Sequence, residues 1–213
     1  MEEDPRGWRS RGYLPHLEAG NKPQFITWRT EDSIPIAVLE AWKAELAGKT
    51  DSERGAELAR RTEKYCDECH GECLLRDPRA ARKVQEVLLY DHMLKYTLHA
   101  WVVMPNHVHV LLTPNPDVKL FSIMRRLKTV SSTAVNRLFG RSGQFWQIDY
   151  FDRMQRDSEH FARTKHYIEW NPVKAKLCTD PSMRTWSSRS PKSLARLEFL
   201  VRKKEESKKP EAD

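Results

Sequence analysis

The chain has 213 residues, of which 39% are hydrophobic and 31% are charged, a composition typical of one globular domain with polar extensions. Lys and Arg number 37 against 30 Asp and Glu, and the net charge of +7 makes nucleic acid the first candidate among partners. The sequence has no apolar run long enough to span a membrane, and its first residues lack the pattern of a signal peptide. We therefore expect a cytoplasmic, nucleoid-associated protein that does not bind membranes.

Residues 1 to about 22 are polar, basic and interrupted by Gly and Pro, which indicates an arm without regular structure. Apolar periodicity and turn residues predict the later elements. In chain order these are a strand at 24–29, a helix at 36–46, a charged segment at 49–77 with a short helix near 56–65, a helix from 78 to about 95, strands at 96–104 and 107–113, a helix at 120–138, a strand at 144–151, a helix from 157 to about 170 that ends at Asn171-Pro172, a short helix near 193–202 and a disordered tail at 203–213.

This order of elements predicts an α+β fold, a ferredoxin-like antiparallel sheet backed by helices. We expect three parts: an N-terminal arm at 1–22, a main domain at 23–177 in which 49–77 is a charged insertion, and a C-terminal extension with a disordered tail at 178–213.

The strand at 107–113 carries two histidines, His107 and His109. Because strand side chains alternate between two faces, the two imidazoles project from the same face, with Val108 and Val110 on the other. Two imidazoles side by side on a stiff strand form half of a metal site. The alternative is a pair of ordinary polar positions on a half-buried strand.

The last helix of the main domain carries Tyr167 and Asn171 four residues apart, and therefore on one face. Beside the histidine strand, Asn171 is a candidate third metal ligand through its amide oxygen, and Tyr167 is a candidate nucleophile. Imidazole and amide oxygen ligands with open positions suit a divalent cation, Mg²⁺ or Mn²⁺, that also holds a phosphate.

The helix at 120–138 carries Arg125, Lys128, Ser132 and Asn136 on the face opposite its apolar residues. Cations and small hydrogen-bonding side chains at helical spacing suit a nucleic acid backbone, although a solvated helix face gives the same pattern.

Three cysteines, Cys66, Cys69 and Cys73, crowd one segment together with His70, while Cys178 lies far downstream. Cys66-x-x-Cys69-His70 matches the attachment pattern of c-type haem, but the surroundings are charged and nothing indicates export. A zinc site remains possible, yet no second Cys-x-x-Cys pair completes it. We expect free thiols in a surface insertion.

Two motifs resemble those of one known family. Met104-Pro105-Asn106-His107-Val108-His109 resembles the His-hydrophobic-His (HUH) motif of single-tyrosine HUH nucleases, and the segment from Tyr167 to Ala175 resembles the tyrosine helix of REP-associated tyrosine transposases. The resemblance runs from about residue 12 to about residue 188. The sequence departs from the family pattern in the segment 51–72 and at Ala175-Lys176, where a small residue followed by Gly is commoner.

The resemblance implies a ferredoxin-like domain in which His107, His109 and Asn171 bind the metal and Tyr167 is the nucleophile. It also implies metal-dependent cleavage and strand transfer of single-stranded DNA through a 5′-phosphotyrosine, on hairpin-forming repeat DNA, by a monomer or homodimer. The DNA would cross the helix bearing Arg125, Lys128 and Ser132, and its bases would stack on aromatic residues of the 144–151 strand. Those residues are Trp146, Tyr150 and Phe151, of which Tyr150 is also the rival nucleophile.

Two other functions compete with this one. A domesticated protein could bind structured single strands without cutting them. A nucleotide hydrolase with a His-x-His-x-His run is disfavoured because position 111 is Leu.

Overall fold

The computed structural model describes residues 8–10 and 15–207. The N-terminal segment, expected to lack regular structure, contains two short antiparallel strands, β1 (Trp8–Ser10) and β2 (Pro15–Leu17). What the sequence predicts for residues 1–7, 11–14 and 208–213, including the last part of the tail, lies outside the described residues.

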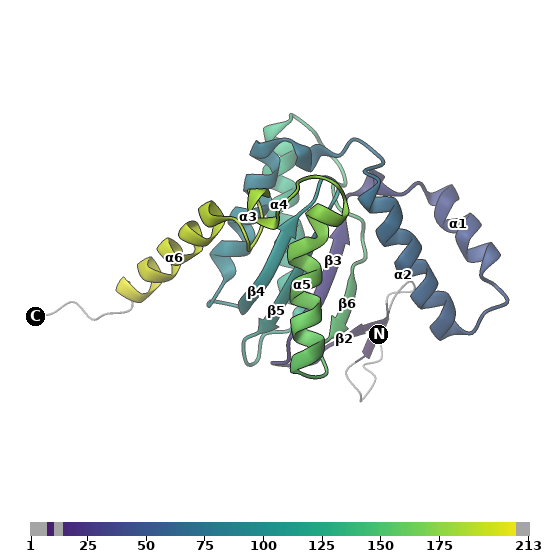
Figure 1. The fold of residues 1–213 in the computed structure, drawn as a ribbon, viewed down its shortest axis with the longest axis horizontal. Coiled ribbons are helices and arrows are strands. Elements are labelled where there is room, and N and C mark those ends of the chain that lie inside the picture. Colours follow the sequence, from purple (N-terminus) through teal and green to yellow (C-terminus); the bar gives the residue numbers. More distant parts are fainter. Residues whose placement is uncertain (1–7, 11–14, 208–213) are drawn as a thin grey trace, which may run out of the picture.

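A four-stranded antiparallel sheet forms the centre of the protein (Figure 1). Its strands are β3 (Gln24–Arg29), β4 (Tyr96–Val103), β5 (His107–Pro114) and β6 (Phe151–Met154), in the spatial order β4-β5-β3-β6. Chain order strand–helix–strand–strand–helix–strand, with the first and third strands at the centre, is the ferredoxin-like topology. The predicted fold class is therefore confirmed.

Helices cover both faces of this sheet (Figure 1). The crossover helices α3 (Pro78–Asp91) and α4 (Leu120–Leu138) pack together on one face, and α5 (Ser158–Lys174) covers the other. The other helices are α1 (Ile36–Glu45), α2 (Asp51–Asp67) and α6 (Pro191–Glu206), with short 3₁₀ turns at Glu31–Ser33, Leu74–Arg76 and Pro181–Met183. No described helix combines the length and the apolar character that crossing a membrane requires.

The two faces of β5 belong to different cores because its side chains alternate. Val108 and Val110 point into the larger core beneath α3 and α4, whereas Leu111 joins a smaller core with Ile168 of α5. Both faces are covered, so β5 is buried along most of its length. His107 and His109 share the side of Leu111 and therefore face α5.

The charged insertion is more regular than its sequence predicts. In place of a short helix, α2 runs for 17 residues and begins with a capping box between Thr50 and Glu53. Its C-terminal end and the following cysteine segment pack against the β4–β5 turn, where Leu75 N–H donates to Pro105 O at 3.0 Å. The insertion is therefore attached to the turn that precedes the histidines.

Four predicted boundaries are wrong. The helix expected from 78 to about 95, α3, ends at Asp91. The strand expected at 144–151 is mostly irregular chain: Phe145, Trp146 and Tyr150 are buried in the larger core, Trp146 forms an isolated antiparallel bridge with Thr30, and β6 begins only at Phe151. Helix α5 continues through Pro172 to Lys174. Helix α6 extends through Glu206, into the expected disordered tail.

Candidate active site

The β4–β5 hairpin places the two histidines at the end of the sheet beneath α5. His107 and His109 are 1% and 2% exposed, and their Nε2 atoms lie 3.1 Å apart. Burial lowers the pKa of His107 to about 3 and that of His109 well below its usual value, so both rings are neutral near pH 7. Neutral imidazoles are the form that binds metal ions.

Hydrogen bonds fix the orientation of the His107 ring. His107 Nδ1 lies 2.8 Å from Asn106 Oδ1, and Asn106 Nδ2 donates to His70 O at 3.1 Å. Because the amide oxygen only accepts, Nδ1 of the neutral ring carries the hydrogen and Nε2 presents its lone pair. The His70 carbonyl thus acts through Asn106 to set the tautomer of His107.

His109 is held differently, by Thr27 of β3. Its Nδ1 lies 2.7 Å from Thr27 Oγ1, and a hydroxyl can donate or accept. Without a cation, His109 Nε2–H can donate to His107 Nε2 while the hydroxyl donates to Nδ1. If the pair held a cation, the hydroxyl would accept from Nδ1–H and both Nε2 lone pairs would be available to it.

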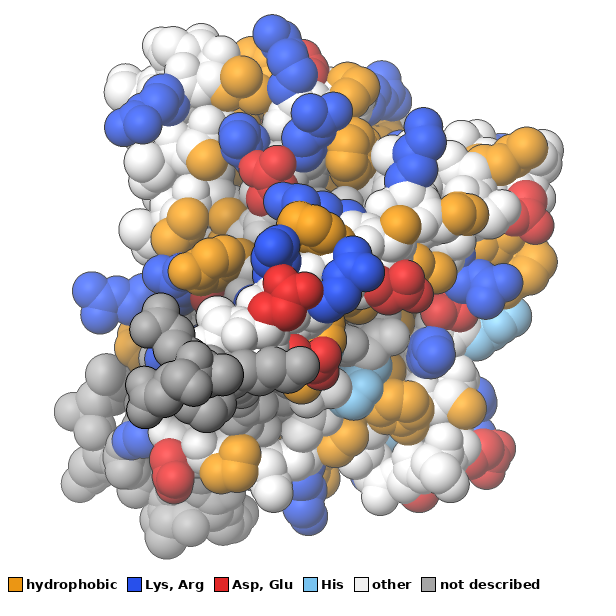
Figure 2. Space-filling model, turned by 90° about the vertical axis from the view of Figure 1, so that its left-hand side faces the viewer, with side chains coloured by type: hydrophobic (Ala, Val, Ile, Leu, Met, Phe, Trp, Pro, Cys, Tyr) orange, Lys and Arg blue, Asp and Glu red, His pale blue; other side chains and the backbone are white. Residues whose placement is uncertain are grey.

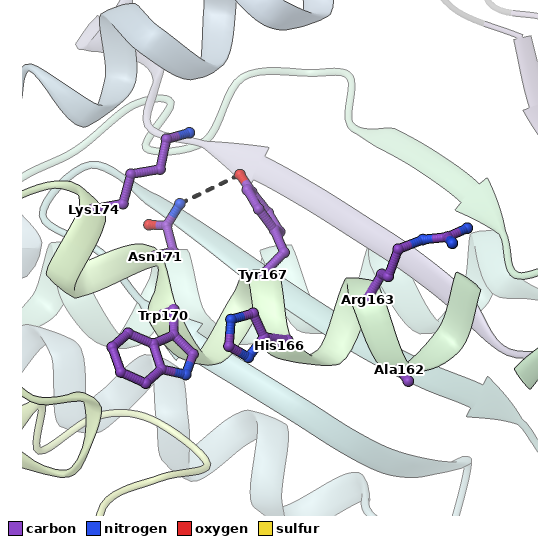
Figure 3. A pocket seen from close by; sticks show the side chains of 7 residues that line it. All are labelled: Ala162, Arg163, His166, Tyr167, Trp170, Asn171 and Lys174. Atoms are coloured by element: carbon purple, nitrogen blue, oxygen red, sulfur yellow. Dashed lines mark hydrogen bonds between the residues drawn. The ribbon is translucent and has the colours of Figure 1, made fainter. Parts of the chain in front are cut away.

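Helix α5 brings the two predicted helix residues to this histidine pair. The Tyr167 ring centroid lies 5.5 Å from that of His109 and 5.8 Å from that of Phe25, in edge-to-face contacts. Asn171 Nδ2 lies 3.3 Å from the Tyr167 hydroxyl (Figure 3). The four residues from two separate motifs therefore form one cluster.

The donor set fits a divalent cation. Asn171 is 1% exposed, and its Oδ1 is buried without a hydrogen-bond partner among the described residues. An unpaired buried oxygen in the same cluster as two neutral imidazoles is a combination that a bound cation would satisfy. Within the described ranges, no three His, Cys, Asp or Glu side chains are already arranged as a metal-binding group, so the histidine pair needs a further oxygen donor, and the unpaired Asn171 Oδ1 is one candidate.

The charged surroundings of Tyr167 come from α2 and from the end of α5. Burial is the main cause that raises the pKa of Tyr167 far above its usual value, and the carboxylates of Glu63 and Asp67 raise it further. Lys174 Nζ lies 5.6 Å from the centre of the Tyr167 ring and forms an ion pair with Glu63. The phenol is thus protonated at rest.

An open pocket of about 550 Å³ adjoins this cluster on the outer side of α5 (Figure 3). Tyr167, Asn171, Arg163, Trp170 and Lys174 line it, together with Ala162 and His166. Trp170 is 43% exposed. The pocket offers cations and an aromatic face directly beside the candidate nucleophile.

Most residues predicted to contact DNA lie on the other face of the sheet, whereas Phe151 packs against Phe25 on the side of Tyr167. Arg125, Lys128 and Ser132 belong to α4, which packs in the larger core. Lys128 Nζ donates to the carbonyls of Gln147 and Ile148. Trp146 is 4% exposed and donates its indole N–H to Ser131 at 2.9 Å, so stacking on Trp146 would require it to leave the core. The DNA contacts of Arg125 and Ser132 remain predictions.

The four cysteines are free thiols. Cys66 and Cys73 are buried rather than displayed at the surface of the insertion, and burial raises their thiol pKa values to about 12 and about 11. The described residues show no metal group at this segment. The sequence did not indicate that the cysteine segment supports the site, where the carbonyl of His70 orients Asn106.

Comparison with known proteins gives a family match and two similar structures. Residues 79–171, slightly under half of the chain, match the family model described as "Transposase IS200 like". The structure of a REP-associated tyrosine transposase bound to a REP hairpin is 17% identical, covers 84% of this chain and 82% of its own, and has a TM-score of 0.49. A Deinococcus radiodurans R1 protein assigned as a transposase is 19% identical, with coverages of 76% and 96% and a TM-score of 0.31.

No curated protein matches the chain. The family match begins at the start of α3 and ends at Asn171, so it contains both histidines and Tyr167, while α2 lies outside it. Residues 79–171, the part of the chain that holds the histidine pair, Tyr167 and Asn171, are therefore similar to the IS200-like transposase family.

Proposed function

We propose that this transposase-family protein cleaves and rejoins single-stranded DNA by metal-dependent transesterification, with Tyr167 as the nucleophile. The observation that carries the proposal is the cluster of Tyr167, Asn171 and the histidine pair, which unites a phenol with three neutral metal-binding side chains. The family match supports DNA cleavage as the general activity.

His107, His109 and Asn171 would hold the cation, Mg²⁺ or Mn²⁺. When bound, it would polarise the scissile phosphate and stabilise the charge that develops there. The protein contributes the neutral state of the rings through burial and their orientation through Asn106 and Thr27.

In the proposed reaction, the Tyr167 oxygen attacks the phosphorus atom and forms a 5′-phosphotyrosine. The bond between phosphorus and the 3′ oxygen breaks, and that oxygen leaves as a 3′-hydroxyl after taking up a proton. The phenol must lose its proton as the new bond forms. Burial and the nearby carboxylates oppose this deprotonation, because they raise the pKa of Tyr167. Because one phosphodiester replaces another, rejoining needs no nucleotide cofactor.

We propose hairpin-forming single-stranded DNA as the substrate, on the strength of the motif resemblance to REP-associated tyrosine transposases. The pocket beside Tyr167 supports a single-stranded path, since Trp170 can stack on a base and Arg163 can contact a phosphate.

The substitution Tyr167→Phe tests the mechanism, because it deletes one oxygen and preserves the contacts of the ring with His109 and Phe25. We expect folding and Mn²⁺ binding to persist while cleavage of a labelled hairpin and the covalent adduct disappear. Denaturing gels detect the adduct, and mass spectrometry of the trapped peptide identifies the modified residue.

Tyr150→Phe is the matched control, because Tyr150 lies in the larger core on the other side of the sheet. It should leave the adduct in place. Persistent cleavage by Tyr167→Phe, or a nucleotide on the peptide that contains Tyr150, would contradict the assignment. Hairpin binding by the wild type without any cleavage would favour the non-cleaving binder.

A further inference from the structure

Helix α2 brings a carboxylate to the candidate metal site from outside the family match. Asp67 is the last residue of this helix, and its Oδ1 lies 3.8 Å from His107 Nε2. Its other oxygen lies 3.7 Å from Lys174 Nζ on α5. No motif connects Asp67 to the histidines, because the contact depends on how α2 packs against the sheet and α5.

The negative charge of the Asp67 carboxylate is only partly balanced by neighbouring groups in this position. The side chain is 13% exposed, and Oδ1 is buried without a hydrogen-bond partner among the described residues. Burial is the main cause that raises the pKa of this carboxyl to about 6. A buried carboxylate oxygen without a partner is costly, and a cation would remove that cost.

The separations agree with ligands around a single ion. With metal–ligand bonds of about 2.1 Å, octahedral ligands lie about 3 Å apart in neighbouring positions and about 4 Å apart in opposite ones. The two Nε2 atoms are 3.1 Å apart and Asp67 Oδ1 is 3.8 Å from His107 Nε2, so both distances fall in this range. Asn171 adds a second buried oxygen without a partner.

We propose that Asp67 is a further ligand of the metal ion, joining His107, His109 and Asn171. The inference rests on the proposed function and adds a residue that the family motifs do not contain. A carboxylate supplies negative charge and a hard oxygen, which suits Mg²⁺ or Mn²⁺. Four protein ligands leave two octahedral positions for phosphate oxygens or water.

The competing explanation is that Asp67 only pairs with Lys174 and holds α2 against α5. Two substitutions separate these roles. Asp67→Asn removes the charge at nearly constant shape, and Lys174→Met removes the ion pair but retains the carboxylate. If Asp67 is a ligand, the first should weaken metal binding and the second should not.

The experiment is calorimetric titration of the full-length protein with Mn²⁺ in the absence of DNA. We expect Asp67→Asn to bind Mn²⁺ at least about tenfold more weakly than the wild type, the lower end of the loss seen when even an outer-shell partner is removed. Lys174→Met should bind at least as tightly as the wild type, because a nearby positive charge is gone. Mn²⁺ should also raise the thermal midpoint of Asp67→Asn less than that of the wild type.

Glu68→Gln is the control, since it makes the same change of charge at the next residue, whose carboxylate contacts His70 at the surface. It should bind Mn²⁺ like the wild type. If Asp67→Asn bound Mn²⁺ as tightly as the wild type, or if Asp67→Asn and Lys174→Met weakened Mn²⁺ binding equally, Asp67 would not be a ligand. Either result would leave the metal site of the proposed function standing. A wild type that binds no Mn²⁺ would overturn the metal site of the proposed function as well.

Discussion

The tautomer of His107 is fixed through two atoms, Asn106 Oδ1 and His70 O, that belong to neither histidine of the pair. Asn106 directly precedes His107, and sequence alone identifies it only as a turn residue. In the structure it is fully buried and links the His70 carbonyl to His107 Nδ1. A turn amide thereby determines which ring nitrogen is available to a cation.

Removing this link should weaken metal binding. Asn106→Ala frees the His107 ring to rotate or to change tautomer, so we expect Mn²⁺ affinity to fall about ten- to a hundredfold. Titration calorimetry measures the loss. Asn115→Ala is the control, because Asn115 lies beyond the opposite end of β5 and contacts Met93 O. Equal affinities of the Asn106 variant and the wild type would show that the ring needs no such support.

At the scale of elements, helices and strands were predicted best where interactions within the element itself determine them. Helix α4 was predicted at its observed bounds because its apolar residues recur at helical spacing. The His107–His109 and Tyr167–Asn171 pairs were found for the same reason, since each is a spacing within one element.

Elements whose position depends on distant partners were predicted less well. Phe145 and Trp146 resemble strand residues, but they are held by burial in the larger core and by the bond from Trp146 to Ser131. Asp67 reaches the site only because α2 folds back over the end of the sheet, and no periodicity in the sequence indicates that contact. The start of helix α2, by contrast, has a local cause in the capping box between Thr50 and Glu53.

The outer face of α5 should carry more of the DNA binding than α4. Trp170→Ala removes an exposed aromatic ring from the pocket beside Tyr167, and we expect single-stranded DNA binding to weaken by about 1–3 kcal/mol, the usual value of one stacked base. Fluorescence anisotropy in the Tyr167→Phe background, which we expect not to cleave, measures the affinity.

Trp146→Phe is the comparison, because Trp146 is buried and its indole N–H bonds Ser131. It should lower the thermal midpoint and leave DNA affinity unchanged. The reverse pattern, with DNA affinity lost in Trp146→Phe and kept in Trp170→Ala, would return the DNA path to the side of α4.

At the scale of the whole molecule, the basic charge is not gathered on the candidate site alone. On the face shown in Figure 2, Lys and Arg side chains are spread among hydrophobic and acidic ones. A net charge of +7 attracts DNA without choosing its register, so we expect specificity to come from local contacts such as those around Tyr167.

The C-terminal segment completes the sheet that supports the site. β4 is an edge strand, and residues 184–188 run along its open side. Val103 N–H donates to Trp186 O, Ser188 N–H donates to Trp101 O, Trp101 N–H donates to Ser188 Oγ, and the Arg184 guanidinium donates to Val103 O. Covering an edge in this way removes a surface on which chains could pair and aggregate.

Truncation should therefore separate the role of this segment from that of α6. A chain ending at Ser190 keeps the edge covered and loses α6, whose Leu197 and Leu200 pack at the margin of the larger core. A chain ending at Cys178 also loses the four hydrogen bonds to β4, which at about 0.5–1.5 kcal/mol each predicts a further loss of about 2–6 kcal/mol in the free energy of unfolding. Urea denaturation followed by circular dichroism measures the difference, and size-exclusion chromatography should show the shorter chain associating through its exposed edge. If both truncated chains unfolded at the same urea concentration and stayed monomeric, residues 184–188 would be a passive connection to α6 and the β4 edge would need no cover.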